Sequence, residues 1–239
     1  MIENVQSDYI YRPGLFQALV KVDTSIDACG AGARGSMRYG RNDSAFYLPP
    51  DKTMLFGKID TFAIEAMPEP HLQPPSQVWG RMRIWCEGCE IGDFEDPFCG
   101  LYTSYMGFHA LRDRLSSLWL DEFEGLSDQE LWNLLDGALY GYQGDIPLAD
   151  ERSLEEVQRD SARYEPFDFL TNWGEQFDQG GKSFIVYTPA GRVRILNRSL
   201  PPARGLALEA SLVDVTEAID GFTAWFEQES ERLGEPTVE

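Results

Sequence analysis

Two segments with the pattern of a β-hairpin constrain the fold of this chain more than any other feature. In Trp79–Phe94, the β-rich runs MRIWC and EIGDF meet at the tight turn Glu87-Gly88. In Lys182–Asn197, the runs KSFIVYT and RVRILN flank a second glycine-containing turn, PAG. Hairpins pair their strands antiparallel, so these segments argue against a doubly wound parallel sheet.

Helical patterns occupy the region between the two hairpins and return at the end of the chain. Ser127–Glu130 and Ser153–Glu156 are capping boxes, which open helices. The first of these helices should end near Gly141, and further helices are expected over Ser104–Leu120 and from Asp214 onward. The expected buried faces are Met106, Leu111, Leu115, Leu118 and Trp119; Leu131, Leu134, Leu135, Ala138 and Leu139; and Val215, Ala218, Ile219, Phe222 and Phe226. Strands, then helices, then strands predict an α+β fold, an antiparallel sheet built from hairpins with helices packed on one side.

The N-terminal part of the chain is less informative. Residues 1–58 are expected to be an N-terminal extension or the first part of the sheet, and 59–239 an α+β domain that forms one compact unit. One or two strands are expected in Met54–Ala66. Gly30–Gly35 spells GxGxxG, but SMRYGRNDS follows it, which is a poor helix. A dinucleotide site needs a helix there, so this segment is interpreted as a loop.

The charge of the chain excludes several classes of partner. Forty acidic and twenty basic residues give a net charge of −20. A nucleic-acid binder presents a basic surface, so nucleic acid and anionic membranes are excluded, while a basic partner, a cation or simple solubility is favoured. The chain shows no signal-peptide pattern, no apolar run long enough to span a membrane, and four cysteines. A soluble, cytoplasmic protein is therefore expected.

The acidity is concentrated in one part of the chain. Residues 121–180 hold sixteen acidic and three basic residues, a net charge of −13. Acids in first helical turns, such as Asp128, Glu130, Glu155 and Glu156, are also explained by helix capping. Phe94 and Phe123, set among acids, are either interface anchors or core residues. The expected partner-binding residues are Asp93, Phe94, Glu95, Asp96, Asp121, Glu122, Phe123, Glu124, Asp128, Asp145, Asp150 and Glu151.

Motifs for catalysis or metal binding are weak. Cys86 and Cys89 form a CxxC at the hairpin turn, but a structural zinc needs four ligands, and Cys29 and Cys99 form no second CxxC. Two histidines, no GxSxG and no HExxH leave few routes to catalysis. We therefore expect no catalytic residue, no metal and no cofactor.

The first hairpin also carries a family resemblance. Phe62-Ala-Ile-Glu65, Gly80-Arg-Met-Arg-Ile-Trp85 and Ile91-Gly-Asp93 resemble the immunity protein 42 family, the antidotes of bacterial polymorphic toxins. The helix that ends in LLDGALY and the later Phe167-Asp-Phe169 are also similar, so the resemblance spans Ile59–Ile219. It implies a protein without catalytic residues that binds a cognate toxin directly and stoichiometrically. The toxin would be a nuclease with a basic domain, delivered between competing bacteria by contact-dependent or type VI secretion.

Two alternatives from other classes stay open. One is an acidic regulatory or scaffold protein without a toxin partner. The other is a hydrolase that uses two carboxylates, which would require a pocket with two carboxylates about 5–10 Å apart.

Overall fold

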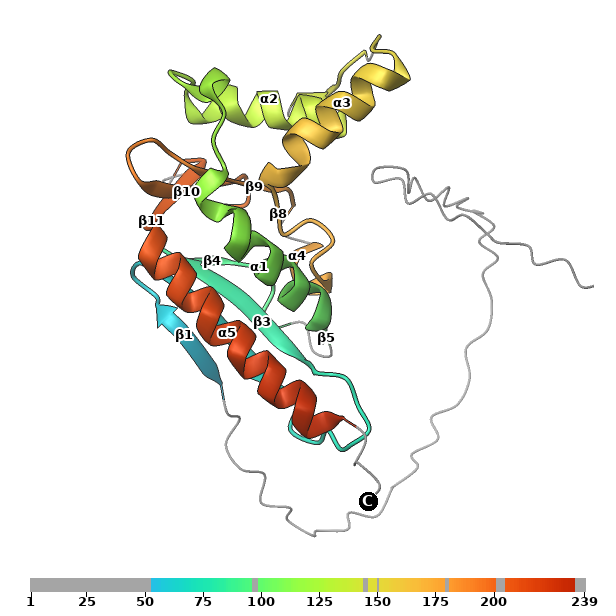
Figure 1. Cartoon of the computed structure of the whole chain (residues 1–239), viewed down its shortest axis with the longest axis vertical. Coiled ribbons are helices and arrows are strands. Elements are labelled where there is room, and N and C mark those ends of the chain that lie inside the picture. The colour runs from blue at the N-terminus through green and yellow to red at the C-terminus, as the bar shows by residue number, and fades with distance from the viewer. Residues whose placement is uncertain are drawn as a thin grey trace, which may run out of the picture. The chain divides into compact units, whose positions relative to one another are not determined.

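The first predicted hairpin forms one side of a five-stranded antiparallel sheet (Figure 1). The computed structural model describes residues 53–95, 99–143, 146–149, 151–178, 181–200 and 205–234. The sheet contains β1 (Met54–Lys58), β2 (Phe62–Pro68), β3 (Trp79–Cys86) and β4 (Cys89–Ile91) in that order, and β5 (Cys99–Gly100) pairs with β3. The strands β3 and β4 are joined by Glu87 (φ 49°) and Gly88 (φ 73°), two consecutive positive φ values that a tight hairpin turn requires.

The second predicted hairpin forms the middle of another antiparallel sheet. Its strands are β9 (Ser183–Tyr187) and β10 (Arg192–Asn197), and the sheet order is β11-β10-β9-β8. The outer strands, β8 (Asp168–Phe169) and β11 (Ala207–Ser211), were not predicted from the sequence. A short two-stranded ribbon, β6 (Tyr142–Gln143) with β7 (Ile146–Pro147), completes the described strands. The α+β class is confirmed, with the strands divided between two main sheets.

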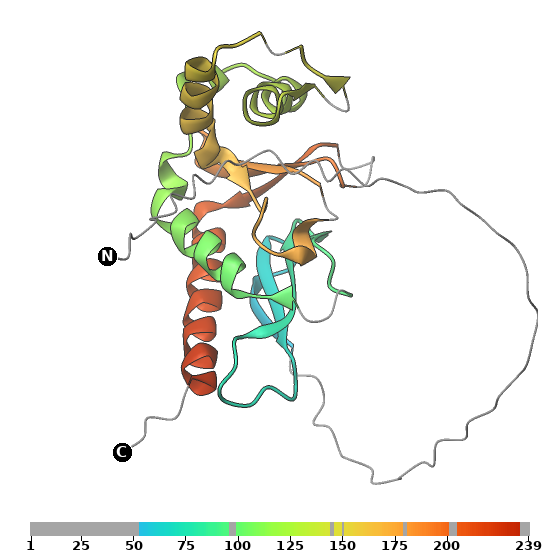
Figure 2. The same ribbon diagram turned by 90° about the vertical axis from the view of Figure 1, so that its right-hand side faces the viewer.

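Two helices cover the first sheet. They are α1 (Tyr102–Arg114) and α5 (Leu212–Leu233), which lie side by side in Figures 1 and 2. The ring of Phe222 in α5 meets Phe56 of β1 at 6.1 Å and Phe108 of α1 at 5.5 Å, both edge to face. The five residues expected on the buried face of α5 are all buried. In α1 the prediction is wrong for Met106, which is exposed because Ser104, Phe108 and Leu111 form the buried face instead.

Two further helices lie together at one end of the fold, over the second sheet (Figures 1 and 2). They are α2 (Asp128–Tyr140) and α3 (Leu154–Tyr164), and both predicted capping boxes are present. The helix α2 ends at Gly141 in the left-handed conformation, as expected. The ring of Trp132 in α2 packs on the ring of Phe184 in β9, with the two ring centroids 4.8 Å apart. Of the face expected to be buried in α2, Leu131 and Leu135 are buried, whereas Leu134, Ala138 and Leu139 are partly buried and pack against the core.

Short helices connect these elements. The 3₁₀ turns η1 (Leu115–Ser117) and η2 (Asp121–Phe123) join α1 to α2, η3 (Glu165–Phe167) joins α3 to β8, and α4 (Glu175–Asp178) precedes β9. All described residues belong to one compact unit. The Gly30–Gly35 motif and the rest of residues 1–52 lie outside the described residues, so the division at residue 58 stays a prediction.

Candidate partner-binding surface

The segment with the strongest negative charge forms η2, α2, α3, η3, β8 and α4. Its net charge of −13 is therefore built mainly on the helical end of the fold and on the turns that lead to it. How much of this charge is available to a partner depends on which carboxylates are already paired within the chain. The predicted site residues fall into three places and one further position, Asp128 at the start of α2, which differ in this respect.

The first place is η2, with Asp121, Glu122, Phe123 and Glu124. Phe123 is buried, and its ring meets Phe167 at 5.0 Å and Trp119 at 5.7 Å, both edge to face. Of the two alternatives for Phe123, the structure supports a core residue. Its burial fastens η2 to the core and leaves the three neighbouring carboxylates exposed.

These three carboxylates are not equivalent. Glu122 accepts hydrogen bonds from Nε and Nη2 of Arg163 at 3.1 and 2.8 Å, and from the Tyr164 hydroxyl at 2.7 Å. Burial, together with the Glu122 carboxylate, raises the pKa of Tyr164 to about 12. Glu122 therefore ties η2 to the end of α3, and its charge is largely offset. The side chains of Asp121 and Glu124 have no ion-pair partner among the described residues.

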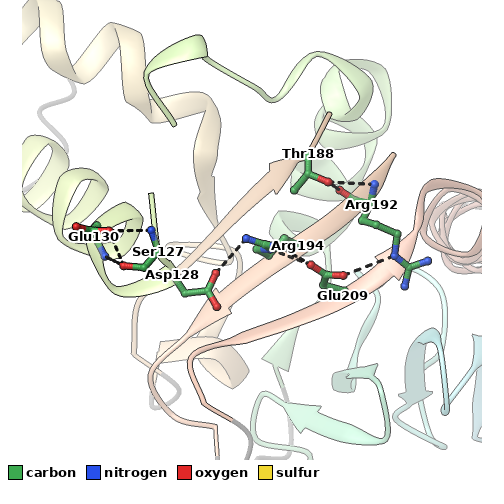
Figure 3. A network of polar contacts seen from close by, with 7 residues as sticks. All are labelled: Ser127, Asp128, Glu130, Thr188, Arg192, Arg194 and Glu209. Carbon is green, nitrogen blue, oxygen red and sulfur yellow. Dashed lines mark hydrogen bonds and ion pairs between the residues drawn. The ribbon is translucent and has the colours of Figure 1, made fainter. Parts of the chain in front are cut away.

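The carboxylate of Asp128 is also paired with an arginine within the chain. Nη1 of Arg194 lies 3.1 Å from Oδ1 of Asp128, and Nη2 of the same guanidinium lies 2.7 Å from Oε1 of Glu209 (Figure 3). Arg192 lies 3.8 Å from the other oxygen of Glu209. This network connects the start of α2 to β10 and β11, so Asp128 has a structural role. Next to it, a groove of about 470 Å³ lies between Glu124, Trp119 and the β9-β10 turn.

The second place is the loop after β4. Oδ1 of Asp93 accepts from the Glu95 amide at 2.9 Å, and the Asp93 amide donates to the carbonyl of Gln176 at 2.7 Å. Phe94 is partly buried, and the guanidinium of Arg83 lies 4.3 Å from its ring centroid. Asp96 lies outside the described residues.

The loop after β4 is distant from η2. Gln176, which the loop contacts, donates a hydrogen bond to Ser104 in the first turn of α1. In contrast, η2 follows the last turn of α1. A helix of thirteen residues is about 20 Å long, so the two predicted contact regions lie near opposite ends of α1. The structure does not join them into one patch.

The third place is the approach to α3. Glu151 is exposed and lines a groove of about 620 Å³ between α2 and α3. Asp145 and Asp150 lie outside the described residues. The apolar lining of this groove, which includes Leu134, Ala138 and Leu148, was not predicted from the sequence. The arginines that offset individual carboxylates were not predicted either. A partial signal was present in Ile146-Pro-Leu148, a short apolar run among acidic residues.

A polar cluster in the first sheet explains several residues of the family resemblance. Oε2 of Glu65 accepts from Nε of Arg83 and from Nε1 of Trp85, each at 2.7 Å. Arg83 also donates to Glu90 of β4 at 3.0 Å. The cluster joins β2, β3 and β4 across one face of the sheet and has a structural role.

The CxxC brackets the hairpin turn as predicted. Cys86 and Cys89 face each other in the register of β3 and β4, and both are buried. Burial raises the pKa of the Cys86 thiol to about 12, with the charge of Glu87 acting in the same direction. Within the described ranges, no group of three or more histidine, cysteine or acidic side chains is placed to hold a metal ion. None of the described helices is long and apolar enough to cross a membrane.

Comparison with known proteins gives one family and one solved structure. The sequence model of a family described as immunity protein 42 matches residues 54–217. The chain is also similar to the crystal structure of CdiI from Burkholderia dolosa AUO158, at 12% identity and a TM-score of 0.49, covering 72% of this chain and 99% of that one. No curated protein matches.

Proposed function

The chain belongs to the immunity protein 42 family, and we propose that it neutralises its cognate toxin by direct, stoichiometric binding through an acidic surface. Immunity proteins are inhibitors, so the function lies in an interface and needs no catalytic residue. The proposed toxin is a nuclease delivered by a contact-dependent secretion system. The acidic surface consists of Asp121, Glu124, Glu151 and Glu155, exposed carboxylates on η2, before α3 and in its first turn.

The observation that supports this surface is the distribution of paired and unpaired charge. Glu122 and Asp128 are offset by arginines within the chain. The four carboxylates of the acidic surface have no ion-pair partner among the described residues, although they lie in the segment of net charge −13. Unpaired charge of one sign attracts a partner of the opposite sign and accelerates its association.

A nuclease is the class of toxin that fits this charge. Nucleases bind a polyanion, so the surface around their active site is basic. Carboxylates of the acidic surface would occupy the positions of phosphates there. The loop at Asp93 and Glu95 would form a separate second contact, because it lies near the other end of α1.

The test begins with affinity purification of the protein from its native bacterium and a moderate-salt wash. We expect one stoichiometric partner with a basic toxin domain. The purified toxin domain should degrade nucleic acid, and one equivalent of the immunity protein should abolish this activity. A partner that is not inhibited at equimolar ratio, or one whose toxin domain is acidic, would contradict the proposal.

A competition measurement separates two modes of inhibition. If the acidic surface covers the active site, the toxin domain in the complex should fail to bind a fluorescent DNA or RNA oligonucleotide. If it binds elsewhere on the toxin, the complex should bind the oligonucleotide without cleaving it. The first result is expected from phosphate mimicry.

A further inference from the structure

The groove between α2 and α3 is lined by both apolar and acidic residues. Leu134 and Ala138 of α2 and Leu148 form the apolar part, and Glu151, Glu156 and Asp160 form the rim. Its volume of about 620 Å³ is large enough for one or two side chains of a partner protein. Among the described residues that line the groove, Arg152 is the one base against three acids, so the net charge of this lining is negative.

Specific contacts within the chain fix the walls of the groove. A Cβ on Gly137 would lie 3.2 Å from Cδ1 of Leu148, so the absence of a side chain there lets Leu148 lie against α2. Arg152 closes one side, because it donates to the carbonyls of Gly137 and Ala138 at 3.3 and 3.4 Å and pairs with Asp160 at 2.6 Å. The charge of Arg152 is thus used inside the chain, and Glu151 is left without an ion-pair partner among the described residues.

Large apolar side chains are exposed in the groove and within two residues of its lining in the sequence. Leu148, which lines it, is 42% exposed; Ile146, two residues earlier, is 70% exposed, and Leu154 in the first turn of α3 is 64% exposed. Single exposed leucines are common on soluble proteins, whereas several close together in sequence beside a groove are typical of an interaction site. They also lie in the most acidic part of the chain.

We propose that this groove is the anchoring site for a segment of the cognate toxin that carries an apolar side chain next to a lysine or arginine. This inference rests on the proposed function and names the part of the surface that holds the toxin after encounter. The apolar side chain packs against Leu134 and Leu148, and the neighbouring cation pairs with Glu151. Charge complementarity selects this occupant, because a second copy of the same acidic helical end would be repelled.

In this proposal, the groove and η2 contribute to different rate constants of toxin binding. Exposed charges such as Asp121 and Glu124 act mainly on the rate of association. A buried apolar anchor acts mainly on the rate of dissociation. Variants of the two regions can be told apart by kinetics alone.

The experiment uses the full-length protein and the toxin domain recovered by affinity purification. Leu148→Ala and Glu151→Lys are compared with Leu55→Ala on β1 and Glu217→Lys on α5. The control Leu55 is 46% exposed, close to the value for Leu148, and it lies on β1 of the first sheet, outside the groove. We expect each groove variant to raise Kd about tenfold or more, chiefly through faster dissociation for Leu148→Ala. Each control should stay within about twofold of the wild type.

A second variant guards against a folding defect. Ala149 is exposed and lines the groove, so Ala149→Trp fills the groove without removing a core contact. It should weaken binding while leaving the unfolding temperature unchanged. If Ala149→Trp and Leu148→Ala both bind like the controls, the groove is not the anchoring site, even if charge reversal at Asp121 and Glu124 slows association. If the wild type does not inhibit the toxin at all, the proposed function fails instead.

Discussion

Lys182 donates a hydrogen bond of 2.5 Å from its ammonium group to Oδ1 of Asp136, a carboxylate in α2 that is only 1% exposed. The same ammonium group lies 4.6 Å from the ring centroids of both Tyr140 and Tyr142. Lys182 directly precedes β9, so the pair fastens the C-terminal half of α2 to the second sheet. The contact holds α2, which packs against α3, on the second sheet.

Removing the lysine should therefore destabilise the protein. In Lys182→Met, the Asp136 carboxylate stays buried without a cation, and we expect the free energy of unfolding to fall by about 3 kcal/mol. Urea denaturation followed by tryptophan fluorescence measures this change. Adding Asp136→Leu to Lys182→Met should recover part of the loss, since the unpaired charge is then gone. An unaltered unfolding midpoint in Lys182→Met would show that the pair contributes nothing.

The cluster around Glu65 predicts how stability responds to acid. Burial raises the pKa of Glu65, but the hydrogen bonds from Arg83 and Trp85 and the charge of Arg83 outweigh burial, so the pKa lies below its ordinary value. A carboxyl group with a lowered pKa stabilises the fold above its unfolded pKa of about 4.3, and this contribution is lost as the pH falls through the folded value.

The variant Glu65→Gln isolates that contribution. The wild type should lose more stability than Glu65→Gln when the pH is lowered from about 6 to about 3. Thermal unfolding at a series of pH values checks the difference. Glu217→Gln is the matched control, because its exposed side chain has no ion-pair partner among the described residues. Parallel curves for the wild type and Glu65→Gln would contradict the role assigned to Glu65.

The parts of the fold that were predictable have a local cause. Consecutive turn residues define the hairpin at Glu87-Gly88, and a serine with a glutamate three residues later defines the starts of α2 and α3. The buried face of α5 follows from its apolar period. Each of these signals is contained within a few residues or helical turns, so no knowledge of distant contacts is needed.

The parts that were missed depend on distant contacts. The strand β8 is two residues long, and β11 takes its place in the sheet by pairing with β10. Leu134 and Ala138 fit the apolar stripe of α2, but they line the groove next to α3. The pairing of Glu122 with Arg163 joins residues forty-one positions apart. The number of carboxylates can therefore be read from the sequence, but which of them remain unpaired cannot.

A further prediction concerns the CxxC motif. A structural zinc requires four ligands, and Cys86 and Cys89 supply two, while no third histidine, cysteine or acidic side chain in the described part of the chain is placed to hold a metal ion with them. Treatment with a chelator should therefore leave the unfolding temperature unchanged. Mass spectrometry under native conditions should show less than one zinc per chain. Stoichiometric zinc, lost together with stability in Cys86→Ser, would contradict this expectation.

The unpaired carboxylates of η2 lead to the last prediction. Reversing Asp121 and Glu124 to lysine should slow association with the toxin about tenfold at low salt, because the attraction between the two surfaces is weakened. Glu122 is left unchanged, since its reversal would also break the contacts with Arg163 and Tyr164.

The control pair Glu217→Lys and Glu231→Lys, on α5, changes the net charge by the same amount. Stopped-flow association at ionic strengths from about 0.01 to 0.5 M, where the screening length falls from about 30 Å to a few ångströms, measures both pairs. The η2 pair should also reduce the salt dependence of the rate. Equal slowing by both pairs would assign the effect to net charge alone, and an unchanged rate at low salt would remove η2 from the toxin-binding surface.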